Sequence, residues 1–73
     1  MENEIKYEKA KYYKEKVRPA HVDCYGMFYN GIVLDVKPEF LILDDEKLGE
    51  MPIFFSEIHN IEPREPKEML KDG

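Results

Sequence analysis

Short apolar runs alternate with turn signals between Tyr25 and Pro63, and no helical periodicity interrupts them. Runs of this length, bounded by glycine, proline or acidic residues, indicate β-strands. The strands expected from the pattern are residues 21–24, 27–36, 40–44, 53–55 and 58–61. The run at 40–44 (FLILD) has no polar alternation, which predicts a central strand buried on both faces. The spacing as a whole predicts a small, strongly bent β-barrel of SH3-like shape.

The first part of the chain has a different pattern, which predicts an α-helix over residues 3–17. Asn3 is a suitable N-cap, and good helix formers follow it. Pro19 ends the helix, because the residue before a proline is pushed out of the α region. The face expected to lie on the barrel contains Ala10, Tyr13 and Val17.

Asn30-Gly31 can be interpreted in two ways. Asn-Gly between apolar runs is a strong hairpin signal, and on that interpretation Tyr29 and Ile32 face each other across a type I′ turn. The alternative places the hairpin at Gly26 and makes Gly31 a glycine within a strand, where the chain bends to close a barrel. The bend is favoured, since it leaves residues 27–36 long enough to serve both sides of a small barrel.

These elements predict a mainly β domain in three parts. Residues 1–18 form an N-terminal helix packed on the barrel, residues 19–63 form the five-stranded barrel, and residues 64–73 form a flexible tail. A chain of 73 residues has room for one modest core, so we expect its stability to be marginal without further support. Cys24 is the only cysteine, which excludes an internal disulfide and leaves self-association as the expected support.

The location expected from these features is the cytoplasm. A single thiol in a highly charged chain fits a reducing compartment. The N-terminus is charged throughout and resembles no signal peptide, and no run approaches the roughly 18 apolar residues of a membrane span. We therefore expect a soluble protein that does not associate with membranes.

Charge is distributed unevenly along the chain. Residues 1–18 contain six basic and four acidic residues, whereas residues 19–73 contain five basic and twelve acidic residues. An acidic barrel argues against broad binding to duplex nucleic acid, which requires many phosphate contacts. A ring of such subunits could still present its helices as a local basic face.

The order of these features resembles the Sm-like superfamily, including its bacterial branch, Hfq. The resemblance runs from the helix to Pro63 and includes Gly31 in the second strand, the apolar run 40–43 and the ending Ile61-Glu62-Pro63. It implies a non-enzymatic barrel whose fourth strand pairs with the fifth strand of the next subunit. The implied partners are further copies of the chain in a ring, single-stranded RNA, and RNA-protein assemblies.

The loops that bind RNA in that family differ in this chain. Family members read uridine with an Asp, an Asn and an aromatic residue, but Lys37, Pro38 and Glu39 occupy the first loop and Leu41 stands at the Asn position. Phe54-Phe55-Ser56 replaces the basic element of the second loop. The residues predicted to contact RNA are Lys6, Lys9, Lys16, Tyr29, Asn30, Lys37 and Phe40. The residues predicted at the subunit interface are Ile53, Phe54, Phe55, Ile58 and Ile61.

Candidates for catalysis or metal binding are sparse. His21, Cys24 and His59 are the only soft metal ligands and lack the paired spacing of a zinc site, so we expect no metal and no cofactor. Ser56 is the only serine and threonine is absent, which makes hydroxyl catalysis improbable. We expect no enzyme activity. The alternative function is an SH3-like scaffold module that binds a protein partner without nucleic acid.

Overall fold

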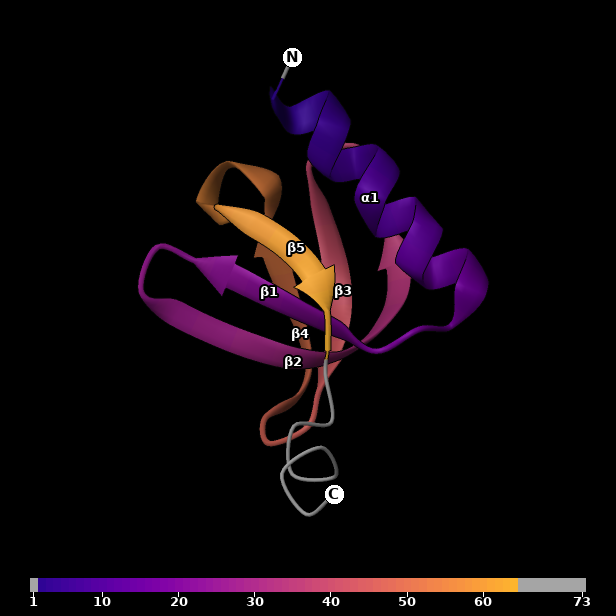
Figure 1. The fold of residues 1–73 in the computed structure, drawn as a ribbon, viewed down its shortest axis with the longest axis vertical. Helices are drawn as coiled ribbons and strands as arrows, with labels where there is room; N and C mark the ends of the chain where they lie inside the picture. Colours follow the sequence, from indigo (N-terminus) through magenta and orange to yellow (C-terminus); the bar gives the residue numbers. More distant parts are fainter. Residues whose placement is uncertain (1, 65–73) are drawn as a thin grey trace, which may run out of the picture.

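The computed structural model describes residues 2–64, which form one helix followed by five antiparallel strands (Figure 1). The elements are α1 (Glu2–Lys16), β1 (Ala20–Cys24), β2 (Met27–Val36), β3 (Phe40–Asp45), β4 (Gly49–Phe54), a short 3-10 turn η1 (Phe55–Glu57) and β5 (Asn60–Pro63). This confirms the prediction of a mainly β fold with an N-terminal helix. The sheet curls in the manner of a small barrel and is not closed, since β4 and β5 stand at its two edges.

The sheet has the order β4-β3-β2-β1-β5, which places the long strand β2 at its centre. The expectation that residues 40–44 form a central strand buried on both faces is therefore wrong. Leu41 and Leu43 point into the core, whereas Phe40, Ile42 and Asp44 lie on the outer face. An apolar run can thus belong to a strand with only one buried face when its outer apolar side chains are only partly covered.

The hairpin between β1 and β2 turns at Tyr25-Gly26, where both residues have positive φ, as a type I′ turn requires. Gly31 lies within β2, so the favoured interpretation of Asn30-Gly31 is confirmed. A Cβ at Gly31 would overlap the carbonyl oxygen of Asp44 on β3. Glycine at this position therefore lets the two strand backbones approach each other.

Both ends of the helix differ from the prediction. It begins at Glu2, so Asn3 lies inside the first turn and is not the N-cap. Val17 has φ of 51° and is 66% exposed, because the chain turns there into the left-handed region. The Arg18 N–H donates to the Tyr13 carbonyl and ends the helix. Ala10 and Tyr13 are buried on the barrel as expected, and Val17 is not.

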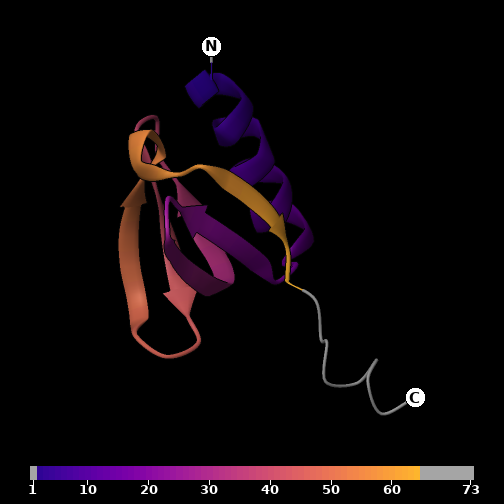
Figure 2. The ribbon, with the colours of Figure 1, turned by 60° about the vertical axis from the view of Figure 1, so that its left-hand side comes forward.

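The core fills the space between the curled sheet and α1, which lies along one side of it (Figure 2). Strands β4 and β5 do not have the expected bounds, because the chain forms η1 where the apolar pattern predicted strand ends. Phe55 begins this turn and Ile58 follows it, and both side chains are completely buried. The predicted flexible tail falls on residues 64–73. Of these only Arg64 is among the described residues, and its N–H donates to the Pro19 carbonyl.

Candidate interaction surfaces

The two edge strands leave an open seam, and a proline limits the hydrogen bonds that each edge can offer. Pro52 lies opposite Ile42 and has no N–H, so its nitrogen must face the free side of β4. Three residues further along, the Phe55 N–H donates inward to the Glu39 carbonyl, as the alternation of inward and outward groups along a strand requires. The same reasoning places the nitrogen of Pro63 on the free side of β5, since the next residue donates inward. Both edges thus expose more acceptors than donors.

A cleft of about 460 Å³ runs beside β4. Its wall is largely apolar and combines the β1–β2 hairpin with β4 and η1. The residues that line it are Cys24, Tyr25, Met27, Tyr29, Met51, Pro52, Ile53, Ser56 and Glu57. Tyr25 and Met27 are 67% and 58% exposed, so large apolar side chains at this seam lack cover within the described part of the chain.

A second pocket, of about 320 Å³, lies between α1 and β5. The Lys6 ammonium donates to the Phe55 carbonyl at 3.1 Å, and the Lys9 ammonium donates to Asn60 Oδ1 at 2.8 Å. His59 lies at the same pocket, its ring 5.0 Å from that of Tyr25. These contacts hold two ammonium groups and an imidazole beside the free edge of β5.

The β2–β3 turn and the end of β4 meet at one end of the sheet. Phe40 and Phe54 are cross-strand partners with ring centroids 5.2 Å apart, and Phe54 is 44% exposed. Lys37 pairs with Asp35 at 3.3 Å. The backbone N–H of Val36, followed by the bond from Lys37, lowers the pKa of the Asp35 carboxyl. This end therefore presents an aromatic pair beside one partly neutralised lysine.

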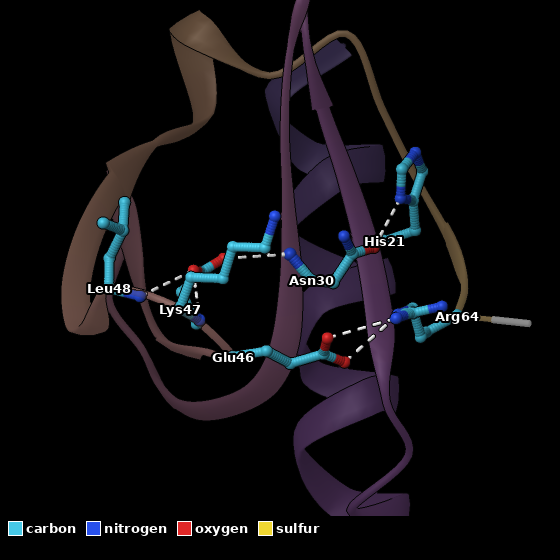
Figure 3. Close-up of polar contacts among 7 residues, drawn as sticks. His21, Asn30, Glu46, Lys47, Leu48 and Arg64 are labelled. Carbon is cyan, nitrogen blue, oxygen red and sulfur yellow. Dashed lines mark hydrogen bonds and ion pairs between the residues drawn. The ribbon is translucent and has the colours of Figure 1, made fainter. Parts of the chain in front are cut away.

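A polar cluster lies where the β3–β4 turn meets β2, and its contacts stabilise the fold (Figure 3). Asp45, the last residue of β3, is only 8% exposed and accepts the N–H groups of Asn30, Lys47 and Leu48 at 2.9–3.0 Å. Burial alone would raise the pKa of this carboxyl, but the three donors outweigh it and lower the pKa. The cluster holds the β3–β4 turn against β2.

The same cluster ties the two edges of the sheet together. The Arg64 guanidinium donates to both carboxylate oxygens of Glu46 at 3.1 Å, so the residue after β5 is joined to the β3–β4 turn (Figure 3). Nearby, the Glu46 N–H donates to the backbone carbonyl of Asn30. The side-chain Oδ1 of Asn30 lies 2.6 Å from His21 Nδ1, which is hydrogen-bonding distance. The seam is therefore bridged at this end, while the two pockets lie at the other.

The seven residues predicted to contact RNA do not form one site. Lys6 and Lys9 lie at the β5 pocket, and Lys37 and Phe40 lie at the β2–β3 turn. Tyr29 lines the β4 cleft, and Asn30 belongs to the polar cluster. Lys16 is exposed in the last turn of α1. The structure thus distributes these candidates over five places.

Four of the five residues predicted at the subunit interface have buried side chains within the single chain. They are Ile53, Phe55, Ile58 and Ile61, with exposed fractions of 3% or less. Only Phe54 presents its side chain to solvent. For the other residues of β4 and β5, an interface would use the backbone of the edge. Sequence reasoning missed Tyr25 and Met27, whose apolar character gave no sign that the cleft would leave them exposed.

The nucleophile and metal candidates are also separated. Burial, followed by the nearby carboxylates of Glu57 and Asp23, raises the pKa of the Cys24 thiol, which disfavours the reactive thiolate. Among residues 2–64, no three His, Cys, Asp or Glu side chains gather in a way that could hold a metal ion. No helix in this part of the chain is long and apolar enough to cross a membrane.

No protein-family model matches the chain, and no curated protein sequence matches it.

Proposed function

We propose that this chain is a non-enzymatic Sm-like module whose copies join through the free edges of β4 and β5 into a ring, and that the ring binds single-stranded RNA. The observation that carries the proposal is the strand order β4-β3-β2-β1-β5, which leaves two complementary edges on one open seam. An uncovered edge pairs readily with another strand. The exposed apolar side chains around the β4 cleft would be buried by such pairing.

The RNA site proposed for the ring is the end where the β2–β3 turn meets the end of β4. Exposed Phe54, supported by Phe40, supplies an aromatic surface on which a base can stack. Lys37 supplies a cation for a phosphate, with Asp35 as its counter-charge in the free protein. Because one copy contributes few contacts, binding depends on repetition of this site around the ring.

A titration with labelled oligouridine and oligoadenine, at low and moderate salt, tests the RNA role. Phe54→Ala should weaken binding by about fivefold to a hundredfold, as loss of a stacking surface does. Lys37→Glu should also weaken RNA binding, and the loss should be larger at low salt than at moderate salt, because a phosphate contact is screened by salt. Lys47→Glu, in the β3–β4 turn at the opposite end of the sheet, is the matched control and should have little effect. Binding no tighter than that of an acidic control protein would rule the role out.

A second candidate function is favoured by the outer face of β3 and β4. Two apolar rows, Phe40 opposite Phe54 and Ile42 opposite Pro52, lie beside the acidic row Asp44 opposite Glu50. Like charges directly opposite each other are unfavourable, so this row would gain from a cationic partner. The two prolines that interrupt the edges also suit a chain that does not pair edge to edge.

On that alternative the protein is a scaffold module for a partner segment that is apolar and basic. It predicts a monomer whose partner binding weakens strongly in Ile42→Lys and hardly at all in Leu48→Lys, an exposed position outside the two rows. A ring that binds RNA and is insensitive to Ile42→Lys would exclude it.

A further inference from the structure

The two sides of the seam differ in charge. The β5 side carries the Lys6 and Lys9 ammonium groups and His59 around its pocket. The β4 side carries Glu50 on the strand and Glu57 at the end of η1, both exposed. An interface in which one surface meets a different surface of the next copy requires this kind of complementarity.

Backbone pairing alone gives such an interface little specificity. On β4 the outward N–H groups belong to Glu50 and Phe54, since Pro52 between them has none. On β5 the outward donor is the N–H of Ile61, because Pro63 has none. A ladder this sparse leaves the register between two copies weakly defined. Side chains flanking the strands must therefore define it.

The position of Glu57 relative to β4 indicates where it would meet a neighbouring copy. All four strand pairs in the sheet are antiparallel, and an antiparallel continuation places the end of β4 beside the start of β5. The chain after β4 then runs past Asn60 and the pocket next to it. Within its own chain Glu57 lines the β4 cleft near Cys24.

We propose that Glu57 of a second copy of this chain seats between Lys6 and Lys9 in the β5 pocket and sets the register of the assembly. This contact rests on the proposed edge-to-edge function and names the residues that select the partner. Each lysine ammonium has three donors and uses one in its observed bond, so both can donate to an incoming carboxylate.

The surroundings of the pocket are consistent with an incoming carboxylate. Glu62 is the acidic residue of β5, and its carboxylate accepts the Asn60 side-chain amide at 3.0 Å. Asn60 in turn accepts from Lys9, so the amide separates the two charges while orienting both. Ile5 and the buried Ile61 also line the pocket, so apolar side chains adjoin the ion pair and would reduce its screening.

Charge reversal with rescue tests this contact on the full chain. Sedimentation equilibrium should show that Lys9→Glu and Glu57→Lys each weaken assembly by about fivefold to tenfold per interface. The double variant Lys9→Glu/Glu57→Lys should recover most of the loss, because the pair is restored with its charges exchanged. Lys16→Glu is the matched control, an exposed lysine two turns further along the same helix, and should assemble normally.

The possible results are distinguishable. A wild-type chain that is monomeric at every concentration overturns the edge-to-edge function, and the Glu57 contact with it. A wild-type chain that assembles, with single reversals that assemble equally well or a double variant that does not recover, overturns the Glu57 contact alone. Circular dichroism of each variant shows that the fold is retained, and a second reversal, Lys6→Glu, repeats the test where Lys9→Glu does not fold.

Discussion

Gly31 is the residue at which the sheet is least tolerant of a side chain. A Cβ there would meet the Asp44 backbone, which cannot move without disturbing the β2–β3 pairing. Gly31→Ala should therefore cost about 2–4 kcal/mol in the free energy of unfolding, measured by urea denaturation. Gly26→Ala is the comparison, because a Cβ meets no atom there and only the φ of 106° is unfavourable. A Gly31→Ala chain as stable as wild type would contradict the close approach.

Asp45 gives the chain a specific dependence on acid. Its pKa is lowered in the folded state, so its contribution to stability is present above the unfolded pKa of about 3.9 and is lost as the pH falls through the folded value. Asp45→Asn should cost about 1–3 kcal/mol at neutral pH, because its oxygens accept three backbone N–H groups. The free energy of unfolding of the Asp45→Asn variant should also fall less steeply in acid than that of the wild type, because the variant has no carboxyl to protonate at this position.

The neighbouring exposed residue provides the control for that experiment. Asp44→Asn changes the same chemical group one position earlier, on the outer face of β3. Urea titrations of both variants between neutral pH and about pH 3 would separate the two carboxylates. Equal effects of the two substitutions would show that Asp45 is not the anchor of the β3–β4 turn.

At the scale of elements, α1 packs on the sheet through the face that carries Ala10 and Tyr13. Ala10 is completely buried, so Ala10→Leu should overpack the contact and cost about 1–3 kcal/mol. Glu8→Leu introduces the same side chain at an exposed position of the helix and should change stability little. Thermal unfolding followed by circular dichroism measures both, and equal melting temperatures would contradict the packing of α1 by this face.

The elements show what the sequence could predict and what it could not. The number of strands, their order along the chain, the hairpin at Gly26 and the place of Gly31 inside a strand follow from local patterns of apolar residues and glycine, which act within a few positions. The end of β4 and the start of β5 do not follow from local patterns. The apolar character of Phe55 and Ile58 suits a strand and a buried 3-10 turn equally well. Tertiary packing decides between them.

The candidate site was less predictable than the fold for a related reason. Asp45 stands in the acidic run Asp44-Asp45-Glu46, which gives no sign of burial, and its three donors are backbone groups that only the folded chain brings together. Lys6 and Lys9 were correctly placed on one helix, but their common pocket is completed by β5, about fifty residues away in the sequence. Contacts between distant segments have no local signature.

At the scale of the whole molecule, a helix with excess positive charge stands on an acidic sheet that remains open at one seam. The Arg64–Glu46 ion pair bridges one end of the seam, and two pockets of different character occupy the other. A chain of this size would gain stability if it buried this seam against another copy, as the proposed ring requires. The same seam would give the assembly its direction, since its two sides differ.

The mass of the wild-type protein in solution, measured by native mass spectrometry over a range of concentrations, tests the central claim most directly. The account predicts one closed oligomer, with a mass that is a fixed multiple of 8.7 kDa and does not grow with concentration. A single species of 8.7 kDa at every concentration would contradict it.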